Sequence, residues 1–147
     1  MYRRASSGAI GGTLEVFLVH PGGPFWAKKD AWTVPKGEYE DNEEPLAAAI
    51  REFREETGFA PHEPYLDLGT IQQTNGKLVH AWAFEGDCDP AQLVSNTCEI
   101  DWPPRSGRKL TIPEVDRGAW FTLDDARSRI FKGQEYLLAA LAEELSL

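Results

Sequence analysis

The sequence predicts an α/β fold in which helices cover both faces of a mixed central β-sheet. Three observations support this class. They are short extended segments rich in β-branched and aromatic residues, one clear amphipathic helix among them, and two helical segments near the C-terminal end. The 147 residues suffice for one hydrophobic core, and no repeat or linker divides them. We therefore expect a single domain, residues 1–147.

The N-terminal part of the chain alternates extended segments with turn residues. Strands are expected at Ser6–Ile10 and Leu14–His20, and the second ends at the Pro-Gly-Gly-Pro turn of residues 21–24. A short extended piece follows at Trp32–Val34, and Pro35 ends it.

A helix, a β-hairpin and several shorter elements are expected next. The helix covers Pro45–Thr57, and the hairpin strands Leu66–Gln73 and Leu78–Phe84 flank an Asn-Gly pair that favours a tight turn. The later elements are, in order, a strand, a loop, a strand and two helices: Glu99–Trp102, Pro103–Lys109, Gly118–Phe121, Leu123–Arg129 and Gln134–Leu145.

The charge of the chain restricts its partners. Hydrophobic residues make up 41% and charged residues 27%, as in folded globular proteins, and the formal net charge is −9. Such a charge argues against general binding to a nucleic acid polymer, which requires a basic face. It allows a phosphorylated small molecule, because divalent metal ions can lie between carboxylates and phosphate oxygens.

The sequence also indicates a location. No apolar run is long enough to span a membrane, and no apolar signal core follows Met1–Arg4. Cys88 and Cys98 stand in no metal-ligand spacing and are expected to stay reduced. We expect a cytoplasmic protein, monomeric or homodimeric, without a membrane partner.

The helix at Pro45–Thr57 has an apolar stripe and a defined end. Proline suits the first helical turn, where its missing N–H costs nothing, and Gly58 suits the left-handed residue that ends a helix. The stripe follows the i, i+3, i+4, i+7 rhythm of one buried face and consists of Leu46, Ala49, Ile50, Phe53 and Thr57.

The opposite face of this helix gathers carboxylates. At the helical repeat, Glu52, Glu55 and Glu56 fall within an arc of about 100°. Three such groups repel one another unless a cation neutralises them, and hard oxygen ligands suit Mg²⁺ or Mn²⁺. The alternative is a solvated acidic face on which Arg51 and Arg54 form ion pairs along the helix.

The segment before the helix favours the metal site. The chain reads Gly37, five residues, Glu43, seven residues, and then Arg-Glu-Phe-Arg-Glu-Glu-Thr-Gly-Phe from 51 to 59. This pattern resembles the Nudix box, G-x5-E-x7-R-E-U-x-E-E-x-G-U with U apolar, at every defined position. The resemblance covers about a sixth of the chain and implies a Nudix-type α/β/α sandwich with a loop–helix–loop and C-terminal helices.

The resemblance implies roles for the helix and its loop. Glu55 and Glu56 would be the primary ligands of Mg²⁺, for which Mn²⁺ can substitute. Glu52 would be a further ligand or the base that activates the attacking water. The carbonyl of Gly37 would complete the metal shell, because glycine allows a close backbone approach.

Other residues would support the reaction from outside the metal shell. Arg51 would pair with the glutamates and Glu43 would brace the loop against the helix. Some Nudix members take the catalytic base from a later loop, and Glu114 lies where such a residue would come, with Glu99 the weaker candidate. A solvated loop residue is the alternative interpretation of Glu114.

Substrate contacts are indicated by loop residues. The segment from Trp32 to Gly37 resembles the W-x-x-P-K-G entry of relatives that act on dinucleoside and diphosphoinositol polyphosphates. Lys36 could meet a phosphate, because its stem reaches beyond the glycine turn; the alternative is a solvated lysine. Arg105 and Arg108, next to Lys109, form a basic loop that suits phosphate contact or simple exposure. Four aromatic residues can stack on a base or pack in the core: Trp26, Tyr39, Trp82 and Trp102.

The resulting prediction is a metal-dependent hydrolase of a small organic diphosphate. It would cleave a diphosphate linkage in a nucleoside diphosphate linked to another moiety, with nucleoside triphosphates or dinucleoside polyphosphates favoured. The alternative is a catalytically silent module of the same fold that binds a nucleotide. Degenerate members of the family usually lose a box glutamate, and the presence of Glu52, Glu55 and Glu56 favours the enzyme.

Overall fold

A computed structural model describes residues 1–5, 13–37 and 42–146 of the chain. Its first strand is β1, Tyr2–Ala5, which lies earlier in the chain than the sequence predicted. The predicted strand Ser6–Ile10 and the aromatic residue Tyr39 lie outside the described residues.

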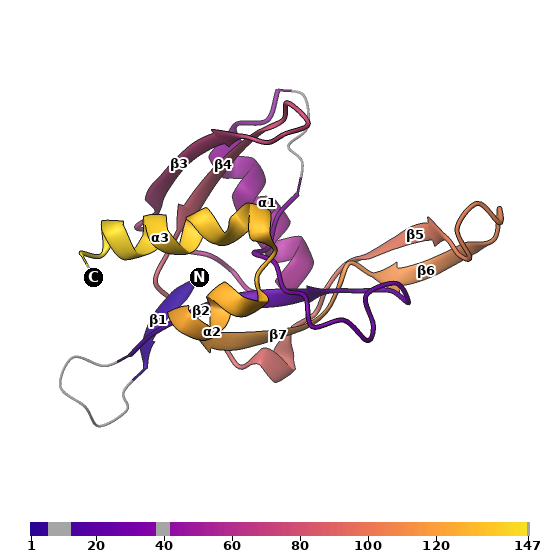
Figure 1. Ribbon diagram of the computed structural model, residues 1–147, viewed down its shortest axis with the longest axis horizontal. Coiled ribbons are helices and arrows are strands. Elements are labelled where there is room, and N and C mark those ends of the chain that lie inside the picture. Colours follow the sequence, from indigo (N-terminus) through magenta and orange to yellow (C-terminus); the bar gives the residue numbers. More distant parts are fainter. Residues whose placement is uncertain (6–12, 38–41, 147) are drawn as a thin grey trace.

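The strands of the described residues form three antiparallel sheets (Figure 1). β2, Thr13–Pro21, lies between β1 and β7, Val115–Thr122, in a three-stranded sheet. Within the described chain, parallel pairing is limited to the isolated bridges Tyr2–Glu85 and Trp32–Ile130, which connect separate elements. The other two sheets are the hairpins β3–β4 and β5–β6, with the strands Leu66–Gln72, Leu78–Ala83, Thr97–Asp101 and Lys109–Pro113.

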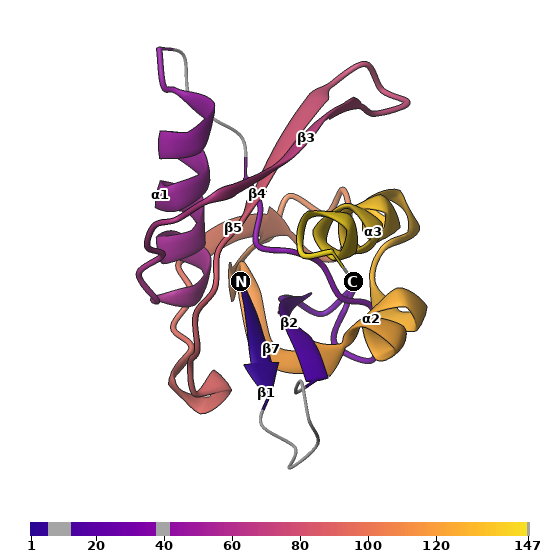
Figure 2. The same ribbon diagram turned by 90° about the vertical axis from the view of Figure 1, so that its left-hand side faces the viewer.

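Helices lie on both sides of the strands (Figure 2). α1, Pro45–Thr57, lies on one side, and α2, Leu123–Arg129, and α3, Glu135–Glu144, lie on the other. Two short 3₁₀ turns, Pro90–Gln92 and Lys132–Gln134, precede β5 and α3. The predicted α/β architecture with a loop–helix–loop and C-terminal helices is confirmed.

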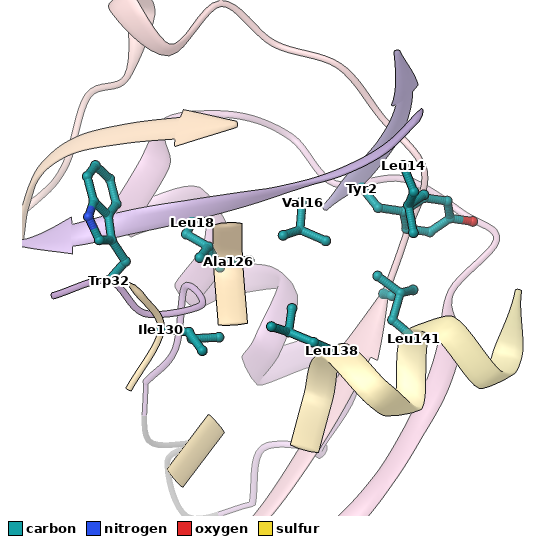
Figure 3. Packing of buried hydrophobic residues seen from close by; sticks show 10 residues of the cluster. Tyr2, Leu14, Val16, Leu18, Trp32, Ala126, Ile130, Leu138 and Leu141 are labelled. Carbon is teal, nitrogen blue, oxygen red and sulfur yellow. The ribbon is translucent and has the colours of Figure 1, made fainter. Parts of the chain in front are cut away.

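β2 is buried on both faces, which explains its nearly continuous apolar sequence. Phe17 and Val19 pack into one core cluster together with Val115, and Val16 and Leu18 point into the other (Figure 3). This second and larger cluster joins β2 to the C-terminal helices through Ala126, Ile130, Leu138 and Leu141, with Tyr2, Leu14, Trp32 and Ala83 beside them.

β6 is the element that the sequence analysis did not find. It assigned Pro103–Lys109 to a loop and expected no strand directly after it, yet β6 begins at Lys109. The strand forms through pairing with β5, where Ile100 lies opposite Leu110 and Cys98 opposite Ile112. Among the residues that the structure describes, no helix has the length and apolar character needed to cross a bilayer.

Candidate active site and metal centre

The end of α1 fixes the rotation of the helix and therefore the direction of its glutamates. Gly58 has a φ of 77°, in the left-handed region that favours glycine, and its N–H donates to the Arg54 carbonyl at 2.8 Å. The Thr57 side chain is fully buried, and its hydroxyl donates to the Phe53 carbonyl at 2.6 Å. Phe53 and Ala48 are buried as well and hold the helix against the domain, whereas Ala49 of the predicted apolar stripe is exposed.

A segment that we call the strap, residues 94–96, binds the C-terminal carbonyls of α1. The N–H of Val94 donates to the Thr57 carbonyl at 3.0 Å, and that of Asn96 donates to the Glu55 carbonyl at 2.7 Å. The carbonyl of Asn96 in turn accepts the N–H of Glu114 at 3.0 Å. The strap thus holds Glu114, just before β7, in register with the helix.

This register brings three carboxylates together. Glu52, Glu56 and Glu114 each offer an oxygen atom, and these atoms all lie within 4.8 Å of one another. We call this group the carboxylate cluster. Glu56 is buried, with 7% of its surface exposed, and one of its oxygens accepts the backbone N–H of Lys36 at 2.9 Å.

The electrostatics of the cluster suit a divalent cation. Burial raises the pKa of Glu56 to about 7, with further repulsion from Glu114 and Glu52, although the N–H of Lys36 opposes the shift. Burial also raises the pKa of Glu52, and the Arg51 guanidinium opposes that rise. Without a cation, the ionised form of the cluster is therefore disfavoured, and a divalent ion bound to these oxygens would stabilise it.

Arg51 organises the carboxylates that surround the cluster. Its Nε and Nη2 donate to both carboxylate oxygens of Glu43, at 2.8 and 2.9 Å, and its Nη1 lies 3.1 Å from oxygens of Glu52 and Glu55. These pairs, with Glu43 first, raise the pKa of the Arg51 guanidinium further. The Glu55 side chain is 40% exposed, and the structure places it beside Arg51, outside the carboxylate cluster.

Gly37 and Lys36 close the site from the loop before α1. A side chain at position 37 would overlap the Glu52 carboxyl group, so glycine leaves the room that this carboxylate occupies.

Gln134, from the turn before α3, holds the segment that precedes Lys36 and Gly37. Its Oε1 accepts the N–H of Val34 at 3.0 Å, and its Nε2 donates to the Thr33 hydroxyl at 2.8 Å.

The role of Gln134 is not visible in the sequence. Its partners are about one hundred residues away in the chain, and a glutamine at the start of a helix gives no local sign of such contacts. By contrast, Glu114 was expected near the site, and the structure brings it into the carboxylate cluster.

We expect Gly37→Ala to weaken metal binding, because the added methyl group would displace the Glu52 carboxylate. The affinity for Mg²⁺ should fall roughly 10- to 100-fold, as for residues that orient metal ligands. Calorimetric titration with Mg²⁺ would measure the change. In a Glu52→Ala background the same glycine substitution should cause no further loss, and a full additional loss there would contradict this explanation.

Two cavities meet at the carboxylate cluster. The larger, about 600 Å³, is lined by Lys36, Gly37 and Glu52 together with residues of α1, β4 and α3. The smaller, about 190 Å³, is lined by Lys36, Glu56 and Glu114 and by aromatic side chains. Lys36 lines both cavities, and its phosphate contact stays a prediction.

The predicted basic loop lies elsewhere. Arg105 and Arg108 are exposed in the turn between β5 and β6, at the end of a hairpin that extends away from the remainder of the molecule (Figure 1). Neither arginine lines either of these two cavities, and Lys109 pairs with Asp101 at 2.7 Å. The geometry gives their predicted phosphate contact no support. Trp102, at the same end, lines neither cavity either.

The fold and the site define a class of protein in which a helix between two loops contributes glutamates to a carboxylate cluster. This cluster suits a divalent cation and borders two cavities. The chain belongs to the family described as NUDIX domain, whose model matches residues 2–141. The resemblance seen in the sequence is thereby confirmed over nearly the whole chain.

Curated relatives and solved structures agree with this family. The chain is 62% identical over 102 residues to the mRNA-decapping protein g5R of African swine fever virus, covering 65% of this chain and 39% of that protein. It is 26% identical over 128 residues to an RNA pyrophosphohydrolase of Bartonella henselae, covering 77% of this chain and 69% of that protein. A C. elegans Ap4A hydrolase has the same fold, with a TM-score of 0.64, 23% identity, and coverage of 99% and 93%.

The lengths of the curated relatives differ from that of this chain. The chain spans 31%, 57% and 39% of the first three that it matches. Their names therefore describe proteins that contain more than the domain shared with this chain.

Proposed function

We propose that the chain is a metal-dependent hydrolase that cleaves a diphosphate linkage of a nucleoside diphosphate joined to another moiety. The single observation that supports this most is the carboxylate cluster, three oxygens within 4.8 Å beside two cavities. The names of the relatives, which include pyrophosphohydrolases and an Ap4A hydrolase, agree with the reaction. Nucleoside triphosphates and dinucleoside polyphosphates are the favoured substrates.

The residues present fit Mg²⁺, with Mn²⁺ as a substitute. Glu52 and Glu56 would hold the ion together with the carbonyl of Gly37, because hard oxygen donors suit it. When bound, the ion neutralises charge on phosphate oxygens and lowers the pKa of water. Glu55, held beside Arg51 at 3.1 Å, is a further proposed ligand from the same helix face.

Glu114 is the proposed general base. Glu52 lies 3.1 Å from the Arg51 guanidinium and is assigned to the metal, whereas Glu114 lines the smaller cavity and, in the described part of the chain, has no cationic partner within ion-pair distance. A water oxygen bonds to phosphorus as its proton passes to the Glu114 carboxylate. The anhydride P–O bond breaks, and its electron pair leaves with the departing phosphate.

The same reaction at the 5′ end of RNA is the second candidate. Relatives named as an mRNA-decapping protein and as RNA pyrophosphohydrolases favour it. The net charge of −9 is the reason to expect contact with the terminal nucleotides only, rather than with a long nucleic acid strand. A small-molecule substrate remains the first proposal.

A product screen with Mg²⁺ tests the function. Nucleoside triphosphates, dinucleoside polyphosphates, nucleotide sugars, and capped or 5′-triphosphorylated RNA would be supplied separately, and phosphorylated products measured. We expect turnover of at least one class, its loss with a chelator, and full activity in Glu144→Gln, which alters an exposed carboxylate of α3. An inactive wild-type protein on every class would refute the proposal.

A further inference from the structure

The two cavities differ in which carboxylates they expose. Glu52 lines the larger, whereas Glu56 and Glu114 line the smaller, although the oxygens of all three lie within 4.8 Å. Lys36 is the residue that the two linings share. A phosphate chain bound at the cluster therefore lies next to both cavities.

The smaller cavity has an aromatic wall. Trp26 and Phe131 line it with ring centroids 5.4 Å apart and planes tilted by 44°. Neither residue belongs to the two core clusters, and the other ring contact of Trp26 is with Phe25, at a centroid distance of 4.9 Å. Backbone bonds fix both positions: the Trp26 carbonyl accepts the N–H of Lys29 at 2.9 Å, and the Phe131 N–H donates to the Trp32 carbonyl at 2.9 Å.

The larger cavity has its own aromatic surface. Trp82 of β4 lines it and stacks on His80, with ring centroids 3.9 Å apart and an angle of 14° between the planes. His80 is held by Asp67, whose oxygen lies 2.8 Å from the ring Nε2. The volume of about 600 Å³ lies within the roughly 300–1,000 Å³ of small-molecule sites, while about 190 Å³ suffices only for part of a ligand.

We propose that the substrate carries a planar organic group on each side of the diphosphate that is cleaved. One group occupies the larger cavity against Trp82, and the other lies on the wall formed by Trp26 and Phe131. A dinucleoside polyphosphate has this form, whereas a nucleoside triphosphate leaves one aromatic surface uncovered. This inference rests on the proposed function and selects among its substrates.

Trp26→Ala tests the inference by comparing two substrates. For a dinucleoside tetraphosphate, loss of the ring should raise KM roughly 10-fold, the usual effect of removing one stacked base contact, with kcat little changed. For a nucleoside triphosphate, KM should stay the same. Trp26→Phe, which keeps an aromatic face, should restore most of the affinity, and Trp102→Ala, which removes a tryptophan that lines neither cavity, should change neither KM.

Equal effects of Trp26→Ala on both substrates, or no effect on either, would overturn the inference. The proposed function fails separately, if the wild-type protein turns over neither compound. Calorimetric binding of the dinucleoside tetraphosphate with Mg²⁺ then decides the inference without turnover. Weaker binding to Trp26→Ala than to wild type would support the aromatic wall, and equal or absent binding would refute it.

Discussion

Glu56→Gln is expected to lower kcat on the order of 10³-fold and at the same time to stabilise the metal-free protein. Activity falls because a neutral amide binds a divalent ion weakly. Stability rises because Gln keeps an acceptor for the Lys36 N–H, at 2.9 Å from Glu56, without a buried negative charge. Such opposite effects are usual where a site is strained for function.

The pH dependence of stability has a defined sign. The pKa of Glu56 is raised from 4.5 to about 7, so the folded protein binds this proton more tightly than the unfolded chain does. Stability of the metal-free wild type therefore falls as pH rises from about 4.5 to about 7, by about 3 kcal/mol from this group, and the penalty is complete above that range.

Denaturant unfolding with a chelator, at pH 4 and pH 8, measures this effect. The wild type should lose stability relative to Glu56→Gln between the two pH values, and saturating Mg²⁺ should reverse the order at pH 8. Glu144→Gln serves as the control, because its carboxylate is exposed. If the stabilities of the wild type and Glu56→Gln changed in parallel with pH, burial of the Glu56 carboxylate would not be the source of the lost stability.

Glu114→Gln should lower kcat by ~10²–10⁴-fold while Mg²⁺ affinity changes little, as expected for loss of a general base. Glu52→Gln should instead weaken Mg²⁺ binding, because its carboxylate lies between Gly37 and Arg51 in the proposed metal shell. Single-turnover rates measured over a range of Mg²⁺ concentrations separate the two effects. The rate loss in Glu114→Gln should persist at saturating Mg²⁺, whereas that in Glu52→Gln should be largely reversed.

The opposite pattern would exchange the roles. If the rate loss in Glu52→Gln persists at saturating Mg²⁺ with unchanged Mg²⁺ affinity, and that in Glu114→Gln is reversed, Glu52 is the base. Glu99→Gln, the weaker candidate in the sequence, is the matched control, because Glu99 is exposed on β5 and lies outside the carboxylate cluster.

The sequence predicted the parts of the site that depend on local periodicity. The bounds of α1 and the common face of its glutamates follow from spacing along one helix, so Glu52 and Glu56 could be placed beforehand. The sequence could not predict which glutamates belong to the carboxylate cluster. Glu55 shares the helix face with Glu52 and Glu56, but it pairs with Arg51 and lies outside the cluster. Whether a glutamate joins the ion pair or the cluster depends on distances in the folded structure.

Non-local contacts account for the other differences between the predicted and the observed structure. Gln134 acts through Thr33 and Val34, and β6 exists through its pairing with β5, so neither leaves a periodic signal in its own segment. The basic character of Arg105 and Arg108 was visible in the sequence, but their position at the end of a hairpin was not.

The strap has a consequence for insertions and deletions. The hydrogen bond from Glu114 to Asn96 closes the β5–β6 hairpin at its base, and the Val115 N–H bonds the Ser95 hydroxyl at 3.0 Å beside it. Both ends of the hairpin therefore join the rest of the domain at one fixed point, and the hairpin extends outward from it (Figure 1). We therefore expect that residues can be inserted into or removed from the end of this hairpin while Glu114 stays in place.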